Sequence, residues 1–195
     1  MEICCGAVVA PDSAARVGHD ALLPFGSALT DALLGDDATE VRWAAKQISR
    51  FGRRMTSSTR GMIGKRAVES IMAKRTDEVD EAVLTVCLGL QDDLDEATLS
   101  NILVFLQQMV AASDKPSSDM GLVLLEQCKR FPPEAQKGLL DTLAASLRPE
   151  TPNLRRLYDL MCRVRPQPEW PRDVQRRVHE AHPTLTVSPS EGKGK

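Results

Sequence analysis

The chain has 195 residues and a formal net charge of −2 at pH 7, so the net charge by itself neither favours nor excludes nucleic acid as a partner. The length suits one domain with tails, and a hydrophobic content of 42% is enough for a substantial core. Because aromatic residues make up only 4% of the chain, the composition favours helices over a β-sandwich or a β-barrel.

The N-terminal part of the chain changes character near residue 25. Residues 1–24 show little periodicity and are predicted to form a flexible tail with at most one turn of helix. Ser27 is expected to cap a first helix that ends at Leu34. Asp37 is expected to cap a second helix, because the apolar positions that follow it keep helical spacing. These positions are Val41, Ala44, Ala45, Ile48 and Phe51.

Helical patterns continue through the middle of the chain. The expected later helix starts are, in chain order, Ser57 or Ser58, Thr76, Asp95, Ser118, Pro133 and Asn153. The helix from Asp95 is apolar on nearly every side, which is typical of a helix at the centre of a bundle or solenoid. Residues 115–118 are predicted to be a loop, and the helix that starts at Ser118 is expected to end at Phe131.

Prolines end this pattern near the C-terminus. Residues 166–182 are predicted to form a proline-rich spacer and a short helix over 171–181, held to the preceding helices by Trp170. Residues 183–195 are poor in apolar side chains and are predicted to be disordered. The expected fold is therefore all-α, with one helical-repeat domain over residues 25–165.

The cysteines give no sign of a redox or metal site. Cys4, Cys5, Cys87, Cys128 and Cys162 are odd in number and form no CxxC pair, which favours a reducing compartment with buried thiols. The apolar run at the N-terminus is too short to span a membrane. Palmitate on Cys4 or Cys5 is an alternative to a plain tail, but one weak acyl signal seldom anchors a protein. We therefore expect a cytoplasmic protein.

Charge is unevenly distributed along the chain. Residues 42–75 hold ten lysines and arginines against one acid, whereas residues 76–100 hold eight acids and no lysine or arginine. The two segments can neutralise each other, or the basic one can form a docking face for an acidic protein partner. The predicted partner-binding residues are Arg42, Trp43, Lys46, Arg50, Arg53, Arg54, Lys65 and Arg66. Nucleic acid is disfavoured because the basic segment lacks interleaved aromatic residues.

No combination of residues predicts a reaction centre. His179 and His182 lie three residues apart without a third metal ligand nearby. Gly61–Lys65 lacks the spacing of a phosphate-binding loop. The acids from Asp92 to Glu96 lack the spacing of a calcium loop, and helix capping explains them better. We therefore expect no cofactor, no metal, no small-molecule substrate and no enzymatic activity.

One segment resembles a HEAT-type repeat, in which a first helix ends near an aspartate and a second opens with Val-Arg followed by alanines. The matching residues are Leu29, Leu33, Leu34, Asp37, Val41, Arg42, Ala44 and Ala45. The later pairs 76–112 and 118–147 keep the helix-pair rhythm without the motif. The resemblance implies a short HEAT-like or armadillo-like α-solenoid, and an irregular bundle of about eight helices is the alternative.

A second resemblance covers about a third of the chain. Residues 78–143 are similar in order and helix lengths to the smallest subunit of the actin-related protein 2/3 complex, a compact armadillo-like helical family. The matching motifs are Val79-Asp80-Glu81-Ala82-Val83, the leucine-rich helix from Leu99 to Val110, Ser117-Ser118-Asp119-Met120, Leu124-Leu125 and Lys129. The family's acidic N-terminal segment is missing, and about 45 residues follow Leu147 that the family lacks. The resemblance implies actin-related proteins as partners and a cytoskeletal location.

Three functions are therefore carried forward. The first is a non-catalytic scaffold subunit of a multiprotein assembly, in its most specific form the small subunit of the actin-nucleating complex. The second is a free-standing HEAT-like adaptor or regulatory effector that binds an acidic protein. The third is a helical protein that binds nucleic acid.

Overall fold

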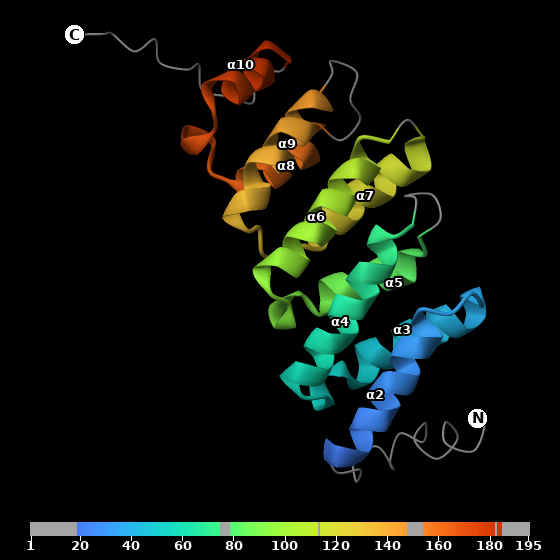
Figure 1. Ribbon diagram of the computed structural model, residues 1–195. Coiled ribbons are helices and arrows are strands. Elements are labelled where there is room, and N and C mark those ends of the chain that lie inside the picture. Colours follow the sequence, from blue (N-terminus) through green and yellow to red (C-terminus); the bar gives the residue numbers. More distant parts are fainter. Residues whose placement is uncertain (1–18, 75–78, 113, 148–153, 182, 185–195) are drawn as a thin grey trace. The chain divides into compact units, whose positions relative to one another are not determined.

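The computed structural model describes residues 19–74, 79–112, 114–147, 154–181 and 183–184 (Figure 1). Every regular element in these ranges is helical, which confirms the all-α prediction for them. The α-helices are α2 His19–Leu33, α3 Ala38–Phe51, α4 Ser57–Met72, α5 Glu81–Gly89, α6 Glu96–Val110, α7 Lys115–Gln127, α8 Pro133–Ala145, α9 Leu154–Val164 and α10 Arg172–Ala181. Three short 3₁₀ helices are η1 Gly52–Arg54, η3 Gln91–Asp93 and η4 Gln167–Glu169.

These helices gather into two compact units. Unit 1 extends to Ile71 and includes Asp80–Leu94, so it holds α2, α3, α5 and nearly all of α4. Unit 2 holds α6 to α10. Each unit has its own set of fully buried apolar side chains, such as Ile63 in unit 1 and Leu103 in unit 2.

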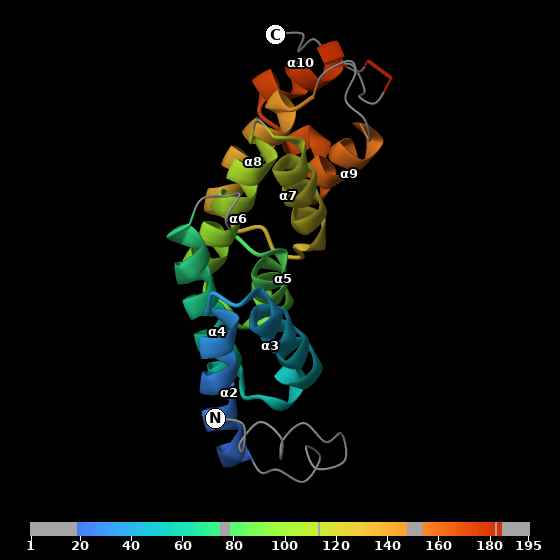
Figure 2. The same ribbon diagram turned by 90° about the vertical axis from the view of Figure 1, so that its right-hand side faces the viewer.

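Unit 1 is built from two layers of helices. Figure 2 shows α2 and α4 in one layer and α3 and α5 in the other. The helix α3 packs against both α2 and α5. An edge-to-face contact joins Phe25 to Phe51, with ring centroids 6.0 Å apart. The predicted apolar stripe of α3 from Val41 to Phe51 is buried, which explains why this amphipathic segment forms a helix here.

Unit 2 repeats the two-layer arrangement. The helix α6 packs against α7 and α8, and α9 contacts both α7 and α8. Figure 2 shows α6 and α8 in one layer and α7 and α9 in the other. Leu99, Ile102, Leu103 and Leu106 of α6 are fully buried, whereas Val104 is exposed on the opposite side. The burial of these side chains agrees with the prediction that α6 lies at the centre of a group of helices.

Aspartates define the N-terminal ends of four helices. Asp37 accepts hydrogen bonds from the backbone N–H groups of Thr39 and Glu40, at 2.7 and 3.3 Å. Asp80, Asp95 and Asp114 cap α5, α6 and α7 in the same way. The caps predicted at Asp37 and Asp95 are confirmed, since each side chain satisfies backbone donors that the helix leaves free. The cap predicted at Thr76 lies outside the described residues.

Three predicted helix boundaries are wrong. The helix α7 ends at Gln127 rather than at Phe131, because the backbone of Cys128 is extended. The segment 115–118, predicted to be a loop, is the first turn of α7, because Asp114 caps it and proline is tolerated at Pro116 in a first turn. The helix α2 begins at His19 rather than near Ser27 and passes through Pro24. Phe25, buried against Phe51, extends the apolar stripe of Leu29 and Leu33 and holds this earlier part of α2 in place.

The C-terminal extension is held by Trp170, as predicted. The indole Nε1–H donates to the Arg165 carbonyl oxygen at 2.5 Å, and the ring makes an edge-to-face contact with Tyr158. The helix α10 follows over Arg172–Ala181, with Val174 and Val178 buried. These contacts hold the proline-rich segment within unit 2.

Replacing Gln47 with methionine is expected to raise the free energy of unfolding by about 1 kcal/mol. Gln47 lies on α3 with only 6% of its surface exposed. Its buried Oε1 atom has no hydrogen-bond partner in the part of the chain that the structure describes. Methionine has a similar volume and no polar group to leave unpaired, so urea denaturation followed by circular dichroism should show a higher midpoint.

The matched control is Gln107→Met in α6. The Gln107 Nε2 group donates to the Gly138 carbonyl oxygen at 2.8 Å and to Thr142 Oγ1 at 2.5 Å. Losing these hydrogen bonds should lower the free energy of unfolding by about 1 kcal/mol. A Gln47→Met variant that is as destabilised as Gln107→Met would show that Gln47 is satisfied in solution.

Candidate protein-interaction surface

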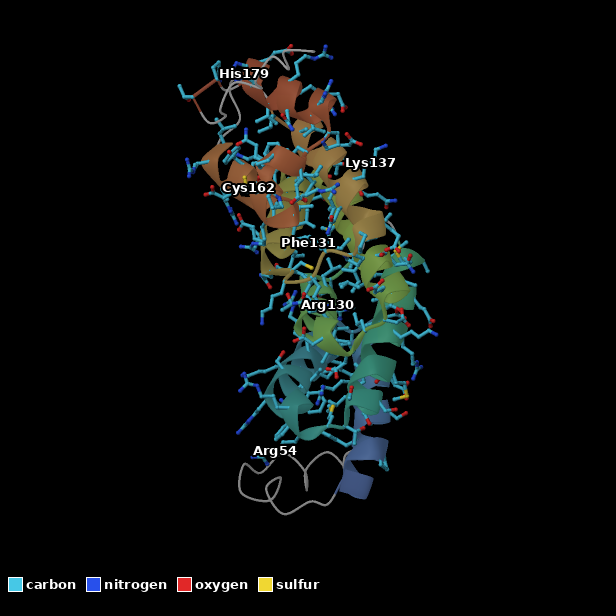
Figure 3. All side chains as sticks on the ribbon, turned by 90° about the vertical axis from the view of Figure 1, so that its left-hand side faces the viewer. Arg54, Arg130, Phe131, Lys137, Cys162 and His179 are labelled. Atoms are coloured by element: carbon cyan, nitrogen blue, oxygen red, sulfur yellow. The ribbon has the colours of Figure 1, made fainter. Side chains whose placement is uncertain are left out.

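A row of basic side chains follows α3 and continues into η1. We call Arg42, Lys46, Arg50, Arg53 and Arg54 the basic ridge. Residues 42–54 contain no acid, and the side chains of all five ridge residues are exposed. Arg42, Lys46 and Arg50 recur every four residues, so they are neighbours along one side of the helix. Figure 3 shows Arg54 projecting from the ribbon.

The ridge is only weakly neutralised. Arg42 Nε lies 4.0 Å from Asp80 Oδ2, and 73% of the Arg42 side chain is exposed. An exposed pair at this distance contributes less than about 1 kcal/mol. The Arg50 guanidinium lies over the Phe51 ring, 5.4 Å from its centroid. Among the residues that the structure describes, Lys46, Arg50, Arg53 and Arg54 have no ion-pair partner. Their charge is therefore available to a partner.

An open groove of about 630 Å³ runs between α3 and α5 in unit 1. It is lined by Arg42, Ala45, Lys46 and Ser49 from α3, by Ala82, Thr85 and Val86 from α5, and by Asp80 and Glu81 at the start of α5. Its middle is therefore formed by small side chains. One wall carries the first two cations of the basic ridge, and the other wall carries two acids.

The acidic wall also has a role in local structure. Asp80 accepts a hydrogen bond from the Ala82 N–H at 2.8 Å, and Glu81 lies in the first turn of α5. Negative side chains at this end of a helix are stabilised by the helix dipole. The acids are thus held in place independently of any partner, so the groove has walls of opposite charge.

The remaining predicted partner-binding residues lie elsewhere. Trp43 is half-buried on α3 and does not line the groove. Lys65 and Arg66 lie on α4, in the other layer of unit 1. Arg66 Nη2 lies 3.3 Å from Asp31 Oδ1 of α2, with both side chains exposed. The structure therefore brings together the basic ridge but does not bring Lys65 and Arg66 to it.

A partly buried polar cluster near η1 had no counterpart in the predictions. The Arg60 guanidinium donates to both oxygens of Asp93, at 2.6 and 2.9 Å, and also to the Met55 carbonyl oxygen at 2.6 Å. Ser57 Oγ donates to Asp93 Oδ1 at 2.7 Å. These bonds join α4, η3 and the end of η1, so they position the Arg53–Arg54 end of the basic ridge. Asp93 is thus an ion-pair partner and not a helix cap, in contrast to Asp95.

Small residues on α4 make this cluster possible. A Cβ atom added to Gly61 would lie 2.9 Å from the Asp93 carbonyl oxygen, and one added to Gly64 would lie 2.5 Å from Leu94 Cδ2. A larger side chain at Gly61 would therefore push η3 away from α4, because the atom that it meets belongs to the backbone. The two glycines are the sequence signal for this contact, but a glycine inside a helix indicates by itself only a lower helix propensity.

A second groove, of about 640 Å³, lies in unit 2 and is lined by Glu126, Arg155, Arg156, Asp159, Leu160 and Arg163. Its arginines are engaged within the protein. Arg156 pairs with both carboxylate oxygens of Glu126, and Arg163 donates to the Glu126 carbonyl oxygen. Arg155 Nε lies 3.2 Å from Asp159 Oδ1. These contacts stabilise α9 against α7, so this groove is a weaker candidate for binding than the one in unit 1.

The described thiols are poorly suited to nucleophilic chemistry. Burial raises the pKa of Cys87 to about 12 and also raises the pKa values of Cys128 and Cys162. These thiols are therefore protonated at neutral pH, and a thiol is a much weaker nucleophile than a thiolate. Cys4 and Cys5 lie outside the described residues.

Within the described ranges, no group of three or more histidine, cysteine, aspartate or glutamate side chains is placed to hold a metal ion; His182 lies outside these ranges. None of the helices found there has the length and apolar character needed to cross a membrane. The chain matches no protein-family model, and comparisons with curated proteins and with solved structures also found no match.

Proposed function

We propose that the protein is a non-catalytic scaffold subunit that binds an acidic surface of a protein partner through the basic ridge. The observation that carries this proposal is the row of exposed cations on α3 and η1, four of which lack an ion-pair partner among the described residues. Such a surface accelerates encounter with an acidic partner and fixes its orientation.

The surroundings of the ridge favour protein over nucleic acid as the partner. Asp80 and Glu81 form the opposite wall of the adjacent groove, and they would repel a phosphate backbone. Among the described residues, no aromatic side chain lines the groove to stack on a base. The groove is also lined largely by polar and charged side chains, whereas small-molecule sites are mostly apolar and more enclosed.

The two-layer arrangement within each unit supports a helical-repeat scaffold of the HEAT or armadillo kind. In such proteins, helices of one layer stack side by side and present an extended binding surface. The resemblance of residues 78–143 to the smallest subunit of the actin-related protein 2/3 complex names the most specific version, with actin-related proteins as partners. Purification from the native cell with mass spectrometry tests this version, because it requires actin-related proteins in stoichiometric amounts.

Reversing the charge of Arg50, Arg53 and Arg54 to glutamate is expected to reduce recovery of the partner at least tenfold without changing the melting temperature. The three side chains are exposed and lack ion-pair partners among the described residues, so folding should not depend on them. The measurement is quantitative mass spectrometry of proteins co-purified with the tagged full-length chain.

The matched control reverses Lys115, Lys137 and Arg172 in unit 2, which are also exposed and change the net charge equally. The control should recover the partner at the wild-type level. Unchanged recovery with the ridge variant, or an equal loss with both variants, would contradict a docking role for the ridge.

A further inference from the structure

We infer that the groove between α3 and α5 receives an acidic amphipathic helix of the partner, an inference that rests on the proposed function and specifies it. The groove is lined by side chains at helical spacing on both walls. Arg42, Ala45, Lys46 and Ser49 follow the i, i+3, i+4, i+7 pattern on α3, and Ala82, Thr85 and Val86 follow the i, i+3, i+4 pattern on α5. The α3 wall alone is about 10 Å long, roughly two turns of helix.

The floor of the groove allows a helix to approach closely. Ala45, Ser49 and Ala82 have small side chains, so a partner helix can place its own side chains between α3 and α5. A helix that lies along a groove in this way binds through residues spaced by three and four positions.

The charges specify which helix fits. On the α3 side, Arg42 and Lys46 are followed by Arg50 and Arg53 beyond the groove, so the flank of the partner helix that faces α3 should carry Asp or Glu every three or four residues. On the other side, Asp80 and Glu81 face the groove only at the start of α5. Because Asp80 Oδ2 already lies 4.0 Å from Arg42 Nε, a lysine or arginine on the opposite flank, near one end of the partner helix, would pair chiefly with Glu81. Walls of opposite sign thus select one orientation of the helix.

A helical peptide library tests this inference on the full-length protein. The library displays alanine-based helices in which the flanking positions vary among Glu, Lys, Gln and Ala. Selection should enrich peptides with Glu at i and i+4 on one flank and Lys on the other. The enriched peptide and a scrambled peptide of the same composition are then compared by fluorescence anisotropy, and the scrambled peptide should bind at least tenfold more weakly.

Filling the groove should abolish this binding. Ser49 and Thr85 line the groove and are exposed, so Ser49→Trp and Thr85→Trp should fold normally while occupying the space of the helix. Each substitution should lower the affinity for the enriched peptide at least tenfold. The control Ser58→Trp, at an exposed position outside the groove lining, should leave affinity unchanged. Lys46→Glu should lose affinity, and exchange of one peptide Glu for Lys should restore it.

Several results would overturn the inference. They are the absence of an enriched charge pattern, equal binding of the scrambled peptide, wild-type affinity in both groove-filling variants, or displacement of the peptide by an oligonucleotide of comparable affinity. If these occur while the Arg50, Arg53 and Arg54 reversal still prevents recovery of the partner, the docking function stands and the partner engages the ridge without entering the groove.

Discussion

Replacing Gly121 with alanine is expected to lower the free energy of unfolding by about 2 kcal/mol, the typical cost of overpacking a close contact. At this point α7 lies against the backbone of α6. An added Cβ atom would lie 2.8 Å from Met109 Cβ, 2.9 Å from the Val110 nitrogen and 3.1 Å from the Leu106 carbonyl oxygen. Backbone atoms inside a helix cannot move aside as the end of a side chain can, so α7 itself must shift. Urea denaturation monitored by circular dichroism measures the change.

The control for this substitution is Gly138→Ala in α8, which lies in the same unit. The nearest atom to an added Cβ at Gly138 is Gln107 Nε2 at 3.4 Å, an ordinary contact. In the interior of a helix, alanine is more favourable than glycine by about 1 kcal/mol. This variant should therefore be as stable as the wild type or more stable. If both variants lose stability equally, the close approach of α6 and α7 is not what limits position 121.

Several helices could be predicted from the sequence, whereas the close helix contact at Gly121 could not, and the two outcomes have related causes. Apolar residues spaced by three and four positions identify a buried stripe without reference to any other part of the chain, which is why α3, α6 and α8 could be predicted. A glycine inside a helix looks only like a loss of helix propensity when it is considered alone. At position 121, glycine is needed because the backbone of α6 lies against α7 at this point. The sequence around Gly121 does not show this contact with another helix.

The errors at helix ends arise because the same residue types occur both in loops and in the first turn of a helix. Pro116 with two serines suggested a loop, yet proline and serine are also common in a first helical turn after an aspartate cap. The weak periodicity of residues 1–24 and the capping signal of Ser27 suggested that the first helix begins near Ser27. The buried contact of Phe25 with Phe51 stabilises the earlier turns of α2, and this contact depends on tertiary packing.

The candidate site was only partly accessible to sequence reasoning. The charge run identified the basic ridge, because α3 alone arranges Arg42, Lys46 and Arg50 along one side. The groove could not be predicted, because it forms only where α5 lies beside α3. The separation of Lys65 and Arg66 from the ridge could not be predicted either, because it depends on which layer each helix joins. The pairing of Arg60 with Asp93 joins residues 33 positions apart, and no local pattern specifies such a pair.

Replacing Asp93 with asparagine is expected to lower the free energy of unfolding by about 2 kcal/mol at pH 7. Only 12% of the Asp93 side chain and 24% of the Arg60 side chain are exposed, so asparagine would leave the guanidinium largely buried without its counter-charge. Breaking a fully buried pair costs about 3–5 kcal/mol, and the partial exposure of Arg60 reduces this figure. Asp92→Asn, at the exposed neighbouring position, should change stability by less than about 0.5 kcal/mol.

The stability difference between the wild type and Asp93→Asn should also depend on pH. The hydrogen bond from Arg60 is the main cause that lowers the pKa of Asp93 in the folded protein, with a further contribution from Ser57. A carboxyl group with a lowered folded-state pKa stabilises the protein above its unfolded pKa of about 3.9, and this stabilisation is lost as the pH falls through the folded value. The difference should therefore be constant from pH 8 to about pH 5 and should decrease below about pH 4.

Denaturation of both proteins in parallel between pH 7 and pH 3 isolates this effect, because every other carboxyl group titrates in both. A difference that stayed at its neutral value down to pH 3 would mean that the contribution of Asp93 does not depend on its charge. A loss of the Arg60–Asp93 pair should also release η1, which carries Arg53 and Arg54. The Asp93→Asn variant is therefore expected to show weaker partner recovery at neutral pH than Asp92→Asn, even though neither substitution lies on the basic ridge.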